Sequence, residues 1–366
     1  MVDATHRFCP FEEDPVERQG CLLRNLDSLL HEVGVDEYTA LSKLKAKGWK
    51  DKRMDDHFQE QRDAADHASN KLGRVWFCKM KDIFKEIDAK SGCIPQTKKV
   101  SFLDLGCCPG GFTSYILEQN PKAKGFGISL EVEKGGHKYL LDRHHRARFK
   151  LLFADLTYFQ LGPEVINDPR LKPLPPQITS RSRGLVVLDG HLLRTQEDVR
   201  NFDYDRLVVS QLVMGLLGVK IGGTIVMKLS KPDAVRTAKV LYMLDAISDC
   251  LSTCKPLTMH GSRGTFYAIA KGVGLGTDAK RLPTIVEGLQ KLWFELTFGG
   301  DEGRGRFLNE TDLDFIACTD ELLGNYLGRL IELGREVWIV QATCLRGLLR
   351  KKGIDVDDVV LPSNII

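Results

Sequence analysis

The stretch DLGCCPGGFTSYIL, residues 104–117, decides the fold class of this chain. It leads from an apolar run that ends at Asp104, through a turn, into a helical pattern that we expect to begin near Thr113. The turn is rich in glycine, with Gly106, Gly110 and Gly111. Glycine lets a ligand approach the backbone closely, and ligands of open α/β sheets lie beyond the carboxyl ends of the strands. The stretch therefore predicts a strand, a ligand-binding loop and a helix.

The spacing of these glycines argues against two common ligands. The pattern is G-x-x-x-G-G, which differs from the G-x-G-x-x-G of dinucleotide sites, and no G-K-[ST] follows to hold a triphosphate. A phosphate-binding role is therefore the weaker interpretation of the loop.

Around this stretch, residues 100–275 alternate short apolar runs with helical patterns, which is typical of a mostly parallel α/β sheet. The expected strands are VSFLDLG (100–106), AKGFGISL (123–130), FKLLFADL (149–156), RGLVVLDG (183–190), GGTIVMKL (222–229) and TFYAIAKG (265–272). Residues 161–184 hold five prolines and predict an irregular loop. Residues 21–90 and those after 276 show helical periodicity.

The composition of the 366 residues is ordinary for a globular protein, with 43% hydrophobic and 28% charged residues. Lysine and arginine number 52 against 49 acids, so the net charge of +3 neither demands nor excludes a nucleic-acid partner. No apolar run suggests a signal peptide or a membrane helix, so we expect a cytoplasmic or nuclear protein that is not secreted. The ten cysteines lack zinc-site spacing, which predicts reduced thiols and no metal.

The opening stretch resembles the D-L-G-x-x-P-G-G-[FW]-[ST] signature of the FtsJ-like family of RNA 2′-O-ribose methyltransferases, where it opens the S-adenosylmethionine site. The resemblance extends over about residues 71–275. It implies an α/β fold of the Rossmann-like class I methyltransferase type, with a mostly parallel seven-stranded sheet flanked by helices. Residues 1–70 and 276–366 would then be helical N- and C-terminal extensions.

The same resemblance implies a catalytic set of Lys, Asp, Lys and Glu around the reacting hydroxyl. Its acid after the fourth strand falls on Asp189, and its strand lysine in GGTIVMKL falls on Lys228. The helix segment WFCKMKDI places the other lysine at Lys79. We expect Lys228 to activate the hydroxyl, Asp189 to orient Lys228, and Lys79 to act as a positioning cation. Alternatively, Asp189 caps a turn, and Lys79 is a solvated lysine whose role Lys81 or Lys85 takes.

The chain departs from the family pattern at the fourth position. The glutamate falls on Thr265 when aligned by Tyr267, or on Gly264 when aligned by Ser262 and Arg263, and neither carries a carboxylate. Three alternatives follow: catalysis by three residues, an acid supplied from elsewhere, or a lost or altered activity.

The resemblance also implies a set of cofactor-binding residues. Asp155 in FADLT corresponds to the acid that binds the adenine amino group, although it could instead cap a helix. The usual acid after the second strand is replaced by Ser129, which leaves Glu131 as the candidate for ribose binding. The remaining candidates lie in the opening stretch and are Asp104, Gly106, Pro109, Gly110, Gly111 and Phe112.

The expected partner is RNA. Two basic segments, residues 42–53 and 143–150, are candidate contacts, and each is equally readable as a solvated surface. Two other functions remain open: methylation of a small-molecule hydroxyl, and a scaffold that binds S-adenosylmethionine without turnover. The sequence sets no oligomeric state.

Overall fold

The computed structural model describes residues 26–66, 70–96, 98–193, 196, 199–200 and 202–362. A seven-stranded sheet with strand order β3-β2-β1-β4-β5-β7-β6 forms its centre. The first five strands run parallel, and β7 pairs antiparallel with both β5 and β6. The strands are β1 (Ser101–Leu105), β2 (Lys124–Ser129), β3 (Phe149–Phe153), β4 (Arg183–Leu188), β5 (Val219–Ser230), β6 (Ser248–Cys254) and β7 (Thr265–Val273). The Rossmann-like class I methyltransferase fold expected from the resemblance is confirmed.

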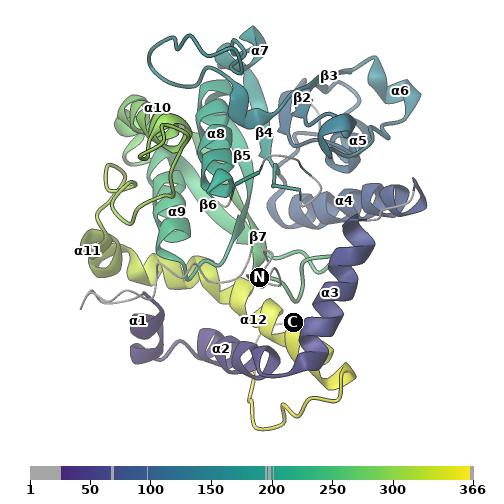
Figure 1. The fold of residues 1–366 in the computed structure, drawn as a ribbon, viewed down its shortest axis with the longest axis vertical. Helices are drawn as coiled ribbons and strands as arrows, with labels where there is room; N and C mark the ends of the chain where they lie inside the picture. Colours follow the sequence, from purple (N-terminus) through teal and green to yellow (C-terminus); the bar gives the residue numbers. More distant parts are fainter. Residues whose placement is uncertain are drawn as a thin grey trace.

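Helices cover both faces of the sheet, and further helices precede and follow it in the chain (Figure 1). Those before the sheet are α1 (Leu26–Glu32), α2 (Asp36–Trp49), α3 (Lys52–Asp66) and α4 (Asn70–Ser91). Those between strands are α5 (Gly111–Gln119), α6 (Arg143–Arg146), α7 (Pro176–Thr179), α8 (Asp203–Gly218) and α9 (Val235–Ile247). After the sheet come α10 (Leu282–Phe298), α11 (Thr319–Glu321) and α12 (Leu327–Lys351), with a π-helical turn at Leu322–Tyr326.

The two faces of the sheet bury separate hydrophobic clusters. On one face, α4 and α5 pack Phe84 and Phe112 against Tyr267 of β7. On the other face, α8, α9 and α10 lie together, as the left side of Figure 1 shows. Both faces of β4 and β5 are therefore buried, which explains why these strands read as nearly continuous apolar runs.

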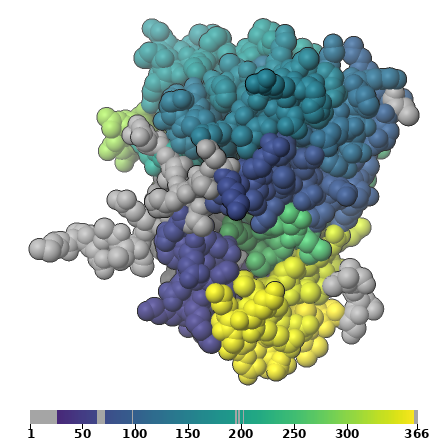
Figure 2. Space-filling model, turned by 90° about the vertical axis from the view of Figure 1, so that its right-hand side faces the viewer, coloured from purple at the N-terminus to yellow at the C-terminus, as the bar shows by residue number. Residues whose placement is uncertain are grey.

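The N- and C-terminal extensions pack against each other beside the β6 edge of the sheet. Tyr38 of α2 contacts Trp338 of α12, with ring centroids 5.3 Å apart. The Trp338 indole donates to Asp233 ahead of α9 at 3.1 Å, and the Thr253 hydroxyl of β6 donates to the Leu333 carbonyl at 2.6 Å. Figure 2 shows the N-terminal helices in purple beside the C-terminal residues in yellow. The extensions thus bury their apolar faces on each other and on the sheet domain.

Three details differ from expectation. The sequence pattern gave no sign of β6, whose SDCLSTC offers one large aliphatic residue, Leu251. The proline-rich loop contains one short helix, α7, which begins with Pro176 at a position where proline needs no amide hydrogen bond. Helix α5 begins at Gly111 rather than near Thr113, so the glycine turn itself enters the helix.

Close packing of α4 on α5 depends on the absence of a side chain at Gly111. A Cβ there would lie 2.4 Å from the Phe77 carbonyl oxygen and 2.6 Å from the Met80 Cβ, so α4 would have to shift. We therefore expect Gly111→Ala to lower the free energy of unfolding by about 1–3 kcal/mol, measured by urea denaturation. The matched control is Gly347→Ala in α12, where nothing lies within 4 Å. It should raise stability by about 0.5–1 kcal/mol, and equal effects of the two changes would contradict the packing account.

Candidate active site

A hollow of about 530 Å³ opens where the carboxyl ends of β1, β2, β3 and β4 meet. Its wall comes from the loops after these strands, including Gly106, Ser129, Asp155 and Gly190. This is where ligands of open α/β sheets bind. The leucines that line the hollow are Leu130, Leu156, Leu192, Leu193 and Leu207. An apolar wall with a few polar groups suits an adenosyl group.

The backbone at Gly106 is held against the loop after β4. Its φ is +79°, and a Cβ would lie 2.5 Å from the Gly190 Cα. The Gly106 amide donates to the Ile128 carbonyl at 2.9 Å. Only glycine fits this position, which joins the ends of β1, β2 and β4 around the hollow.

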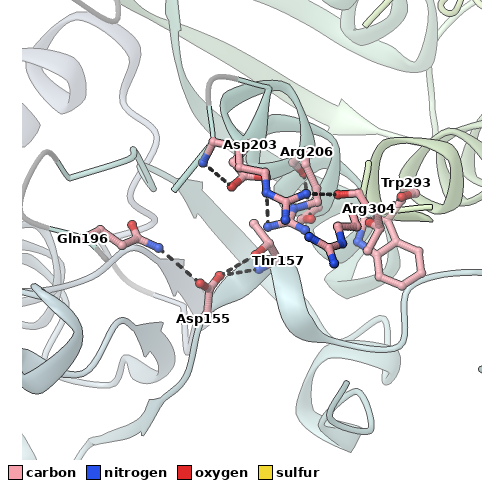
Figure 3. Close-up of polar contacts among 10 residues, drawn as sticks. Asp155, Thr157, Gln196, Asp203, Arg206, Trp293 and Arg304 are labelled. Atoms are coloured by element: carbon pink, nitrogen blue, oxygen red, sulfur yellow. Dashed lines mark hydrogen bonds and ion pairs between the residues drawn. The ribbon is translucent and has the colours of Figure 1, made fainter. Parts of the chain in front are cut away.

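Asp155 follows β3 and lines the hollow. Figure 3 shows its carboxylate between Thr157 and Gln196. Its Oδ1 accepts hydrogen bonds from the Thr157 amide at 2.8 Å and from the Thr157 hydroxyl at 2.7 Å. Its Oδ2 accepts from the Gln196 side chain at 3.2 Å. Asp155 therefore caps the short 3₁₀ turn Leu156–Tyr158, and it also presents a carboxylate at the hollow, so the capping and binding interpretations coexist.

The other loop candidates play different structural parts. Gly110 is the N-cap of α5 with φ +111°, and Gly111 contacts α4. The Pro109 carbonyl accepts from the Leu140 amide at 2.9 Å. The Phe112 ring is fully buried in the core between α4 and β7, so it shapes the loop from behind and does not face a ligand. Glu131 forms an ion pair with Lys134 at 3.5 Å.

Two acidic oxygens near the loop lack hydrogen-bond partners within the described residues. Asp104 is fully buried, and its Oδ2 accepts from the Thr113 hydroxyl at 2.6 Å, while its Oδ1 has no partner. The Glu131 Oε2 is likewise unpartnered. Burial raises the pKa of Asp104 to about 7. Unpaired buried acceptors suit a ligand that brings hydrogen-bond donors, such as the amino group and ribose hydroxyls of S-adenosylmethionine.

Lys228, Asp189 and Tyr267 meet beside this hollow. Lys228 and Tyr267 stand opposite each other in the β5–β7 register, so their side chains leave the same face of the sheet. The Lys228 Nζ lies 3.2 Å from the Asp189 Oδ1, and the Tyr267 hydroxyl donates to that oxygen at 2.8 Å. The exposed fractions are 17% for Lys228 and 5% for Asp189. The sequence-derived pair is thus brought together in a largely dry environment, where its interaction is strong.

Three histidines surround Lys228 and were not singled out from the sequence. His191 contacts Lys228 directly, with Nδ1 2.9 Å from Nζ, and His137 and His191 both line the hollow. The Lys228 charge lowers the pKa of His191 well below its usual range. Burial, with Lys228 adding to it, lowers the pKa of His137 and brings that of His260 to about 3. All three imidazoles are therefore neutral near pH 7.

Lys79 lies on an exposed part of α4 and makes no hydrogen bond or ion pair with Asp189 or Lys228. Its helix face nevertheless points toward the site. Trp76, one turn earlier, contacts the His137 ring at a centroid distance of 5.2 Å. The neighbouring Lys81 is occupied by Glu118 at 2.8 Å. Of these two lysines, Lys79 is therefore the one available to contact a substrate.

The fourth family position holds no carboxylate in space either. The Gly264 carbonyl accepts from the Lys231 amide at 3.2 Å, and the Thr265 carbonyl accepts from the Lys255 amine at 2.6 Å. Within the described part of the chain, Asp189 is the carboxylate that pairs with Lys228. The side chain that contacts Lys228 alongside Asp189 is His191, with Nδ1 2.9 Å from Nζ.

The two basic segments are placed differently. Arg148 donates to the Leu117 carbonyl at 2.9 Å and to the Asn120 carbonyl at 3.1 Å, so it caps the end of α5. In the other segment, Lys47 pairs with Asp358 at 2.7 Å, and Trp49 is 63% exposed. Segment 143–150 therefore uses Arg148 to hold the fold, whereas segment 42–53 uses Lys47 in an ion pair and leaves Trp49 in solvent.

The described residues hold neither a metal-binding cluster nor a membrane-spanning helix. No group of histidines, cysteines and acids there is arranged to hold a metal ion. None of the helices described has the length and apolar character needed to span a membrane.

Comparison with known proteins identifies relatives of the sheet domain. A family model described as FtsJ-like methyltransferase matches residues 78–273, more than half of the chain. The cap-specific mRNA (nucleoside-2′-O-)-methyltransferase 1 of Bos taurus is 27% identical over 196 residues, which are 51% of this chain and 23% of that protein. The corresponding Danio rerio protein is 28% identical over 194 residues, 49% of this chain and 22% of that protein. The chain therefore spans less than a quarter of these relatives.

A solved structure shows a weaker likeness. A Plasmodium falciparum protein described as a ribosomal RNA methyltransferase is 21% identical, with a TM-score of 0.35. The alignment covers 53% of this chain and 95% of that one. At this TM-score the likeness carries no functional weight.

Proposed function

Because this chain belongs to the FtsJ-like methyltransferase family, whose members use S-adenosylmethionine, we propose that it methylates a ribose 2′-hydroxyl of RNA. The observation that carries the proposal is the contact of Lys228 with Asp189 at the end of β5, one side chain away from the hollow. The curated relatives that match this domain are cap-specific mRNA 2′-O-methyltransferases, which supports RNA as the acceptor class.

Asp155, which lines the hollow, and the nearby acids Glu131 and Asp104 fit the cofactor. Asp155 would accept a hydrogen bond from the adenine amino group, and Glu131 would accept from the ribose. The unpartnered Oδ1 of Asp104 would accept a hydrogen bond from the amino group of the methionine portion, directly or through water. When bound, S-adenosylmethionine supplies a methyl group activated by its sulfonium.

The chain's own residues then have two tasks. Methyl transfer is an in-line displacement, so the loops must align the acceptor oxygen with the methyl carbon. The hydroxyl proton must leave as the new bond forms, and we assign its removal to Lys228. Asp189, fixed by Tyr267, orients Lys228. Lys79 would position the substrate from α4, where an exposed cation suits a phosphate.

The direct test is transfer of labelled methyl from S-adenosylmethionine to total RNA, beside DNA and a metabolite extract. Label in RNA, falling steeply with salt because phosphate contacts dominate affinity, is the expected result. Label only in the metabolite extract would redirect the function to a small-molecule hydroxyl. Cofactor binding without label in any acceptor would indicate a scaffold.

A further inference from the structure

The described contacts of the Lys228 amine involve Asp189 and His191 and no second carboxylate. Its Nζ lies 2.7 Å from the Asp189 carbonyl oxygen, 3.2 Å from the Asp189 Oδ1 and 2.9 Å from the His191 Nδ1. An ammonium group has three donors and no acceptor. Hydrogen bonds to the Asp189 carbonyl and to His191 use two of these donors, and the Asp189 Oδ1 adds an ion pair.

His191 is able to play this part only as a neutral imidazole, because a protonated ring offers two donors and no acceptor. The groups facing it from neighbouring elements are Lys228 of β5, His137 from the loop after β2, and His260 from the loop before β7. The positive charge of Lys228 lowers the pKa of His191 well below its usual range. Nδ1 therefore accepts from Lys228, and the proton of the neutral ring resides on Nε2.

On this geometry, and resting on the proposed function, we propose that His191 is a positioning residue that replaces the missing glutamate, holding the Lys228 amine toward the acceptor hydroxyl. Gly264 and Thr265, where the glutamate is expected, offer only backbone contacts to the lysines Lys231 and Lys255. His191 also borders the hollow, so the amine it holds lies where the cofactor and acceptor must meet.

Replacing a carboxylate by an imidazole has a chemical consequence. A carboxylate stabilises an adjacent ammonium by charge, whereas a neutral imidazole stabilises it only as a hydrogen-bond acceptor. His191 therefore holds the Lys228 amine in place without adding the negative charge that a glutamate would bring. Restoring an acid at position 191 should keep Lys228 charged to a higher pH.

Three variants separate these effects. His191→Asn keeps a neutral acceptor near the Nδ1 position and should retain most of the methyl-transfer rate. His191→Asp adds the charge, so the acid limb of the pH–rate profile should move up by about one pH unit or more, with about tenfold less activity on that limb. His191→Ala removes the acceptor and should lower kcat by about tenfold or more while the KM for S-adenosylmethionine stays constant. His31→Ala, an exposed histidine on α1, is the matched control.

A second readout does not depend on RNA. In protein labelled with ¹³C at the lysine ε-carbon, the Lys228 signal is assigned by its loss in Lys228→Met and titrated in each variant. The midpoint should rise in His191→Asp and stay near the wild-type value in His191→Asn. Equal midpoints in both would overturn the role of His191, as would an equal loss of activity in all three variants with an unmoved acid limb.

The two readouts also keep this inference distinct from the proposed function. If wild-type protein transfers no methyl to RNA at any pH, the proposed function fails, and the NMR titration alone then decides whether His191 governs Lys228. If wild-type protein is active and His191→Ala is equally active, the proposed function stands and the role of His191 is overturned.

Discussion

Replacing Lys228 by methionine is expected to lower the rate of methyl transfer by about 10²- to 10⁴-fold, the usual contribution of a positioned acid–base group. Methionine preserves most of the side-chain volume but cannot take up the hydroxyl proton. Asp189→Asn should lower the rate of methyl transfer by a similar factor. The amide carries no charge and cannot reproduce both contacts of the Asp189 Oδ1, with Lys228 and with Tyr267. Single-turnover transfer of labelled methyl measures both.

The matched control is Lys220→Met, which changes an exposed lysine at the other end of the same strand, β5. It should retain the wild-type rate. Thermal unfolding and cofactor binding of each variant verify that the fold and the hollow are intact. A Lys228→Met protein that binds the cofactor and transfers methyl at the wild-type rate would contradict the assignment.

The second large effect is a pH dependence of stability that originates at Asp104. Burial, opposed by the Thr113 hydrogen bond and assisted by Asp189, raises the pKa of this carboxyl from 3.8 to about 7. A raised folded-state pKa means that the contribution is fully present below about pH 4 and is lost as the pH rises through 7. Its size is about 4 kcal/mol. Without cofactor, the wild-type protein should lose this much more stability between pH 4 and 8 than Asp104→Asn.

Urea denaturation at a series of pH values measures this difference. Asp249→Asn, which removes an exposed acid at the start of β6, is the control and should follow the wild-type curve. Parallel curves for wild type and Asp104→Asn would show that Asp104 does not titrate in this range. The comparison uses the slope with pH, so any constant cost of the asparagine amide cancels.

The sequence predicted those parts of the fold that depend on local pattern. The glycine turn had to follow β1, because Gly106 touches the backbone at Gly190 and Gly111 touches α4. Six strands appeared as apolar runs because the sheet is buried on both faces. Asp189 and Lys228 were expected together because of the family resemblance, and the structure places both near the carboxyl ends of the neighbouring parallel strands β4 and β5.

The features that escaped prediction depend on distant contacts. Strand β6 lies at the sheet edge, against α12, and alternates polar residues with few apolar ones, so its pattern is weak. His191 was overlooked because nothing in DGHLL reveals a lysine on another strand. It directly follows the Asp-Gly pair at the end of β4, a position beside the ligand in open α/β sheets, and that place is the signal that could have identified it.

The identity of the methylated atom tests the central proposal most directly. Total RNA is incubated with the protein and S-adenosylmethionine bearing a CD₃ group, then digested to nucleosides and analysed by mass spectrometry. The account predicts CD₃ on the ribose 2′-oxygen, absent with Lys228→Met. CD₃ on a base, or none in RNA while the protein still binds the cofactor, would contradict it.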